Sequence, residues 1–294
     1  MKKLASSIKR VGIIGNSEKV SCAGAVTEAG RLIAKAGRKL FSDPATAALG
    51  KLKANVLRDP ATLARAVDLL LVFGGDGTML RAARQIAGVR TPILGINIGS
   101  LGFLTAVPSS ELARALEEVW QGRFRFEARV LIQATGRARS GSIDETALND
   151  IVISRGSASR LIELDVQVDG DALTRYRCDG LIVSSPTGST AYNLAAGGAV
   201  VFPTANVMSL TPICPHTLSN RSLILPLTAT LHITVISPKP ATILSTDGQV
   251  IAELSLGDRL TIRRSRKAIH LMQLADSSFC ETLRKKLHWR GATL

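Results

Sequence analysis

The chain has 294 residues, of which 46% are hydrophobic and 20% are charged, a balance that excludes a disordered or fibrous protein. Aromatic residues make up only 4%, so the core is expected to be aliphatic. The net charge of +14 favours anionic partners, either nucleic acid or polyanionic small molecules.

Three short apolar runs in the first part of the chain predict buried strands. Residues 11–15 end in glycine, residues 69–73 lead into Gly74, and residues 92–97 form the third run. Continuous apolar runs of this length are typical of the central strands of a parallel sheet, which is covered on both faces.

Helical patterns separate these strands. Residues 23–36 and 78–87 have helical composition, and a third helix, capped by Ser109 and Ser110, is expected to run to about Trp120. The alternation of strand and helix predicts an α/β domain over residues 1–124, with helices flanking a parallel sheet.

From about residue 125 the period changes from helical to alternating. In residues 161–168 apolar and polar side chains alternate, and the same pattern recurs at 231–235 and around 260–262. Apart from a helical segment near 190–198, residues 125–276 are therefore expected to form a mainly antiparallel β domain. Residues 277–294 return to helical composition and are expected to pack on the first domain.

Several classes of partner are not expected. The basic residues are dispersed without interleaved aromatic residues, which argues against nucleic acid. The four cysteines form no C-x-x-C pair and are interpreted as reduced thiols. Neither a membrane span nor a signal-peptide core is apparent, so a cytoplasmic protein is expected.

The segment 69–81, LLLVFGGDGTMLR, carries the clearest chemical signal. Its glycines let the backbone approach a ligand, and the following helix start offers N–H groups to a phosphate. Asp76 would repel phosphates, so it is expected to orient and deprotonate a hydroxyl or to bind a metal ion. The segment therefore predicts a small-molecule kinase. The alternative interpretation is an ordinary strand-to-helix turn without a catalytic role.

The rest of the chain narrows this prediction. Neither a P-loop nor a G-x-G-x-x-G turn follows the first strand, and the pentapeptide GGDGT is similar to phosphofructokinases, to diacylglycerol and sphingosine kinases and to NAD kinases. Further segments are GINIGSLGFL (95–104), ALNDIVIS (147–154), DGLIVSSPTGSTAY (179–192), TPICPHTLSNRSLILP (211–226) and STDGQ (245–249). In this order they resemble the NAD kinase family across nearly the whole chain.

The resemblance implies an α/β domain followed by a β-rich domain, with the active site between them. It implies transfer of a phosphoryl group from ATP or inorganic polyphosphate to the 2′-hydroxyl of the adenosine ribose of NAD. A divalent metal, Mg²⁺ or Mn²⁺, would be held mainly by the nucleotide phosphates, with no protein ligand assigned. A homodimer or homotetramer is also implied.

Site residues follow from matching motifs. Asp76 resembles the catalytic carboxylate that takes the proton of the ribose hydroxyl, and Gly77 with its turn would hold phosphates. Asn149 and Asp150 resemble the pair that binds the adenosine moiety, and Asp179 resembles a residue that contacts the nicotinamide side of NAD. The other expected binding residues are Gly74, Gly75, Thr78, Arg81, Arg160, Arg177, Thr187, Thr190, Ala191, Tyr192, Asn193, Leu194, Ala195, Asp247 and Gln249.

Plainer interpretations remain open for some of these residues. Asp179 and Asp247, each followed by glycine, also fit simple turns, and residues 186–190 fit a tight loop. Arg160 and Arg177 also fit solvated strand positions. His216 is expected to be structural.

Two positions depart from the commonest family pattern. Ile98 stands where arginine is frequent, and Asp150 replaces the commoner glutamate. Both leave the core chemistry in place and bear on donor preference and affinity. A lipid kinase and a non-catalytic NAD(P)-binding sensor are the alternative functions.

Overall fold

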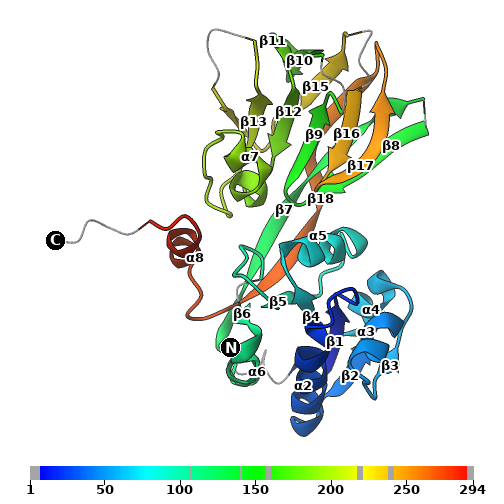
Figure 1. Ribbon diagram of the computed structural model, residues 1–294, viewed down its shortest axis with the longest axis vertical. Helices are drawn as coiled ribbons and strands as arrows, with labels where there is room; N and C mark the ends of the chain where they lie inside the picture. Colours follow the sequence, from blue (N-terminus) through cyan, green and yellow to red (C-terminus); the bar gives the residue numbers. More distant parts are fainter. Residues whose placement is uncertain are drawn as a thin grey trace, which may run out of the picture. The chain divides into compact units, whose positions relative to one another are not determined.

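The computed structural model describes residues 7–105, 107–139, 141–156, 160–216, 221–237 and 242–289. The chain divides into two compact units, Met1–Ala128 with Ile269–Leu294, and Arg129–Ala268. Two long strands, β7 (Phe124–Ala138) and β18 (Arg259–Leu274), each contribute residues to both units (Figure 1). The domain limits expected from the sequence lie at residue 124, where β7 begins, and at residue 276, two residues after β18 ends. An extended strand carries no local signal at the residue where it passes from one hydrophobic core to the next.

The first unit is built on a parallel sheet in the order β5-β4-β1-β2-β3. Its strands are β1 (Arg10–Gly15), β2 (Lys39–Ser42), β3 (Asn55–Val56), β4 (Leu69–Gly74), β5 (Ile93–Asn97) and β6 (Val107–Pro108). β4 lies between β5 and β1 and is buried along its whole length, as its unbroken apolar sequence requires.

Helices flank this sheet. They are α2 (Cys22–Lys35), α3 (Pro44–Leu49), α4 (Pro60–Ala66), α5 (Asp76–Gln85) and α6 (Leu112–Trp120), with the short 3₁₀ helix η1 (Ser109–Glu111) before α6. The last helix, α8 (Phe279–Lys286), belongs to the same unit. The expected Ser109 or Ser110 cap is wrong: α6 begins at Leu112 after η1, with no side-chain capping bond. α3 and α4 were missed, although Asp43 and Asp59 cap them immediately before proline.

The second unit is antiparallel. Its remaining elements are β8 (Gly141–Ala147), β9 (Asp150–Ser154), β10 (Ile162–Val168), β11 (Asp171–Cys178), β12 (Gly180–Ser184), η2 (Thr187–Thr190), α7 (Tyr192–Ala195), β13 (Val207–Ile213), β14 (Leu223–Pro226), β15 (Leu231–Val235), β16 (Thr242–Thr246) and β17 (Gln249–Leu254). One sheet runs β14-β13-β12-β9-β16-β17, and other strands pair as β11-β10-β15-β18. The alternating side chains bury one aliphatic core.

The predicted fold class, an α/β part with a parallel sheet followed by a mainly antiparallel β part, is confirmed. Along the described parts of the chain, no helix combines the length and the apolar character that crossing a bilayer demands.

Candidate functional site

Asp76 is the first residue of α5 and is separated from the buried strand β4 only by Gly75. Gly74 ends the strand with φ at 159°, and a Cβ built on it would lie 2.3 Å from Thr78 Oγ1. Only glycine therefore lets Thr78 pack beneath the turn. Gly75 caps α5 with extended backbone, and Gly77 is exposed. The sequence places a carboxylate at the N-terminal end of a helix, where N–H groups suit an anion.

The Asp76 carboxylate is clamped by the loop after β5. Its Oδ2 accepts a hydrogen bond from the Phe103 N–H at 2.8 Å. Its Oδ1 accepts from the N–H groups of Leu104 at 3.0 Å and Thr105 at 3.2 Å, and from the Thr105 hydroxyl at 3.2 Å. A Cβ on Gly102 would lie 2.1 Å from Oδ1, so this approach requires glycine. The loop fixes the direction in which Asp76 points.

Asn97, at the end of β5, ties the same loop together. Its Nδ2 donates to the Thr105 hydroxyl at 2.9 Å and to the Ser100 carbonyl at 2.6 Å, while its Oδ1 accepts from the Gly99 N–H at 2.7 Å. The side chain of Ile98, where the family often has arginine, packs against the core of the first unit. Ile98 therefore contributes to packing here. Arg81 is exposed on α5.

A second polar cluster lies in the second unit, where β9 begins. The turn residue Asp247 has a positive φ of 47°, and its carboxylate accepts hydrogen bonds from three successive N–H groups. These belong to Leu148 (2.9 Å), Asn149 (2.7 Å) and Asp150 (3.2 Å). Asp247 with Gly248 does form the two-residue turn between β16 and β17, and its side chain also fixes the backbone of the Asn149-Asp150 pair.

Asp150 is buried at the start of β9, with 5% of its surface exposed. Burial, and second the charge of Asp247, raise the pKa of Asp150 to about 7. A carboxyl group with this pKa exchanges a proton near neutral pH, so it can donate to or accept from a ligand.

The segment of Thr187 packs against the backbone of Asn149. A Cβ on Gly188 would lie 2.2 Å from the Asn149 carbonyl oxygen, so the two chains approach closely only because residue 188 is glycine. The Ser185 N–H donates to the same carbonyl at 2.8 Å, and the Gly188 N–H donates to Ser185 Oγ at 3.2 Å. The structure thus brings Asn149, Asp150 and Asp247 together, and it packs the turn of Ser185 and Gly188 against the Asn149 backbone.

Asn193 has a structural environment. It is fully buried, and its Nδ2 donates to the carbonyls of Ser189 and Ala199, while its Oδ1 accepts from the hydroxyls of Ser209 and Thr211. Its amide therefore holds α7 to β13. Around it, Tyr192 and Ala195 are exposed, and Thr190, Ala191 and Leu194 are half-buried. Gln249 is also exposed, at the start of β17.

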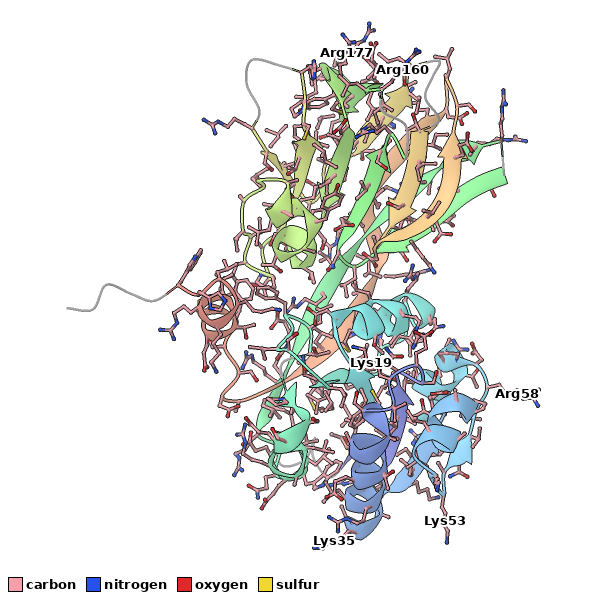
Figure 2. All side chains as sticks on the ribbon, in the orientation of Figure 1. Lys19, Lys35, Lys53, Arg58, Arg160 and Arg177 are labelled. Atoms are coloured by element: carbon pink, nitrogen blue, oxygen red, sulfur yellow. The ribbon has the colours of Figure 1, made fainter. Side chains whose placement is uncertain are left out.

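Three predicted residues lie apart from this cluster. Asp179 forms an ion pair with Arg155, with Nε and Oδ1 2.7 Å apart. Figure 2 shows Arg160 and Arg177 at the end of the second unit opposite α7. Arg177 is exposed on β11, and its Nε lies 3.9 Å from Glu163 Oε1. An exposed side chain with a loose ion pair of this kind is typical of a solvated strand position. The structure brings neither arginine to Asn149, and their role in binding stays a prediction.

Two contacts escaped the sequence analysis. Arg129 is buried, with 5% exposed, and its Nη1 donates to Thr187 Oγ1 at 3.4 Å. An arginine inside a strand gives no periodic signal of burial. The Thr105 contact to Asp76 was also missed, because it joins residues 29 apart. Of the PHTL motif, Thr217 and Leu218 lie outside the described residues, and His216 donates its N–H to the Arg177 carbonyl.

Comparison with known proteins finds matches along most of the chain. The family model for the ATP-NAD kinase N-terminal domain matches residues 11–124, and that for the C-terminal domain matches residues 148–274. The NAD kinase of Moorella thermoacetica is 41% identical over 97% of this chain and 91% of its own length. The NAD kinase of Cupriavidus pinatubonensis is 38% identical over 97% of this chain and 94% of its own length.

Solved structures share the fold. Yeast NADH kinase complexed with NADH superposes with a TM-score of 0.88 at 28% identity, covering 98% of this chain and 89% of its own. An NAD kinase from Archaeoglobus fulgidus in complex with ATP superposes with a TM-score of 0.75 at 22% identity, covering 96% of this chain and 100% of its own. This second match shows a similarity of fold.

Proposed function

The chain belongs to the NAD kinase family, and on that premise we propose that it transfers the γ-phosphoryl group of ATP to the 2′-hydroxyl of the adenosine ribose of NAD, forming NADP and ADP. The bond from the ribose oxygen to phosphorus forms as the bond from phosphorus to the β,γ-bridging oxygen breaks. The observation that carries the proposal is the clamped carboxylate of Asp76 at the N-terminal end of α5.

Asp76 is suited to aim a hydroxyl. Its Oδ1 accepts three hydrogen bonds, whereas Oδ2 accepts one from the described residues, that of Phe103. Oδ2 accepts fewer hydrogen bonds than Oδ1, so it retains a lone pair that can accept a hydrogen bond from the ribose 2′-hydroxyl and receive its proton as transfer completes. Because phosphoryl transfer depends mainly on positioning and charge, a fixed carboxylate serves it better than a mobile one.

The N-terminal end of α5 is proposed to meet the transferred phosphate. Gly77 is exposed there, and the first N–H groups of a helix carry partial positive charge. ATP is the donor that the family description names. Within the described residues, no three His, Cys, Asp or Glu side chains gather as a protein-built metal site requires. We expect the divalent metal to arrive bound to the triphosphate, as part of the substrate.

The second cluster is proposed to recognise adenosine. Asn149 presents an amide, and Asp150 a carboxyl group whose pKa is about 7, so together they offer donors and acceptors to the base edge and ribose hydroxyls. The exposed ring of Tyr192 is available to stack on a base. The roles of Arg81, Arg160, Arg177, Asp179, Asp247 and Gln249 in binding, and a homodimer or homotetramer, stay predictions.

A coupled assay of NADP formation tests the proposal. Purified protein is supplied with NAD or NADH and with Mg-ATP or polyphosphate, and a parallel reaction offers diacylglycerol. NADP formation from NAD and ATP is expected. Phosphorylation of diacylglycerol alone would indicate the lipid kinase, and NAD binding without phosphorylation, under several metals and donors, would indicate a sensor.

A further inference from the structure

Phe103 connects the catalytic carboxylate to the carboxyl-terminal helix. Its backbone N–H donates to Asp76 Oδ2 at 2.8 Å, and its ring contacts that of Phe279, with centroids 6.3 Å apart at 44°. The ammonium group of Lys286 lies 5.7 Å from the centroid of the same ring, within the range of a cation–π contact. One residue of the clamp is thus held by two side chains of α8.

α8 is anchored independently of this loop. The guanidinium of Arg114 binds the carboxylate of Asp276 at 2.8 Å, and Arg125 donates to the Ser277 carbonyl at 2.8 Å. Ser278 caps the helix through its hydroxyl, and Leu283 is buried. The helix is therefore a fixed support rather than a frayed end.

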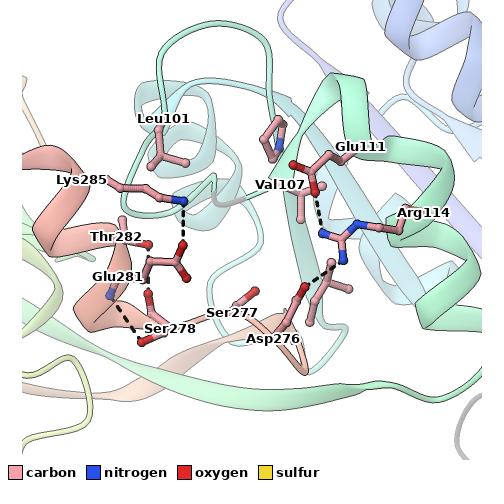
Figure 3. A pocket seen from close by; sticks show the side chains of 12 residues that line it. Leu101, Val107, Glu111, Arg114, Asp276, Ser277, Ser278, Glu281, Thr282 and Lys285 are labelled. Carbon is pink, nitrogen blue, oxygen red and sulfur yellow. Dashed lines mark hydrogen bonds and ion pairs between the residues drawn. The ribbon is translucent and has the colours of Figure 1, made fainter.

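A cavity of about 210 Å³ lies beside this support, lined by Leu101 of the clamp loop and by Thr282 and Lys285 of α8. Figure 3 shows its charges satisfied among themselves, with Arg114 joined to Glu111 and Asp276, and Lys285 to Glu281. Phe103 meets α8 through two contacts, the ring of Phe279 and the ammonium group of Lys286.

We propose that Phe279 is a positioning residue for Asp76: it fixes the Phe103 side chain and, through it, the N–H groups that orient the carboxylate. The proposal rests on the proposed function, in which Asp76 meets the ribose hydroxyl. Phe279 itself touches no reacting atom in this scheme. Its loss shifts the loop rather than removing a donor, and small displacements of a catalytic group lower turnover strongly.

Kinetics of three variants test the link. In Phe279→Ala, kcat is expected to fall about tenfold while the KM for NAD changes less than about twofold. Phe279→Leu keeps apolar volume and is expected to lose about threefold. Phe126→Ala is the matched control, because it removes one ring of another aromatic pair in the same unit, with Phe124 at 5.2 Å, and should leave kcat unchanged.

Hydrogen exchange provides a readout independent of activity. The N–H groups of residues 103–105 donate to Asp76, so peptides covering them should lose protection at least about tenfold in Phe279→Ala and keep it in Phe126→Ala. Unchanged protection, or unchanged kcat, would overturn the proposal. If Phe279→Ala does not fold, Phe279→Leu decides by the same two measurements. A wild-type protein that forms no NADP would refute the proposed function, and exchange would still decide whether α8 supports the clamp.

Discussion

Asp150 and Asp247 are joined by reciprocal backbone and side-chain hydrogen bonds. The Asp150 N–H donates to Asp247 Oδ1 at 3.2 Å, and the Asp247 N–H donates to the Asp150 carbonyl at 3.0 Å. This pairing places a second carboxylate near the buried carboxyl of Asp150. Burial first, and the charge of Asp247 second, raise the pKa of Asp150 from 3.8 to about 7.

Asp150→Asn is expected to change the pH dependence of stability. Between about pH 4 and pH 7 the native state keeps a proton that the unfolded chain has released, so the free energy of unfolding falls as pH rises and stays lower above pH 7. The amide that replaces the carboxyl group in the variant does not ionise, so the variant escapes this loss of stability. It should be more stable than the wild type by about 4 kcal/mol at pH 8 and about equal to it at pH 4. Urea denaturation at both pH values measures it. Asp171→Asn, at an exposed position, is the control. Parallel pH profiles for wild type and Asp150→Asn would refute the raised pKa.

Asp76→Asn is expected to lower kcat at least about 100-fold while the Kd for NAD changes less than about threefold. The amide cannot take the ribose proton, and its NH₂ group would face an N–H donor of the clamp, either Phe103 or Leu104. Steady-state kinetics and calorimetric titration with NAD separate the two effects. Asp43→Asn, which alters the cap of α3 in the same unit, should retain turnover. Near-normal turnover in Asp76→Asn would remove Asp76 from the mechanism.

Gly102→Ala is expected to displace the Asp76 carboxylate. The added Cβ would lie 2.1 Å from Asp76 Oδ1 and 2.5 Å from Thr105 Oγ1, so kcat should fall at least about tenfold, with a loss of about 2 kcal/mol in unfolding free energy. Gly99→Ala is a close control in the same loop, since a Cβ there meets nothing within 4 Å. Equal kinetics for the two variants would show that the clamp does not control turnover.

Gly188→Ala tests the second cluster. Its Cβ would meet the Asn149 carbonyl oxygen at 2.2 Å, and because this neighbour is backbone, Asn149 must move. The KM for NAD should rise at least about tenfold, with a smaller change in kcat. Gly24→Ala, whose Cβ meets nothing within 4 Å on α2, should be neutral. An unchanged KM in a folded Gly188→Ala protein would separate Asn149 from NAD binding.

Local patterns predicted the elements that carry the first cluster. The apolar run of β4 ends where glycines begin, and α5 starts within the GGDGT turn. Short elements without a periodic apolar pattern were harder to predict. α3 and α4 are short helices whose start is marked by Asp-Pro rather than by a long apolar stripe, and the serines before α6 form a 3₁₀ turn instead of a cap.

By itself the sequence determined the family, the fold class and the turn that bears Asp76, because these depend on motifs and periodicities that neighbouring residues carry. What holds the site together was decided by tertiary structure. Asp76 meets Phe103 across 27 residues because β4 and β5 are parallel neighbours, and Asp247 meets Asn149 across 98 residues because β16 pairs with β9. Strand pairing creates such contacts, and no local pattern encodes which amide will reach which carboxylate.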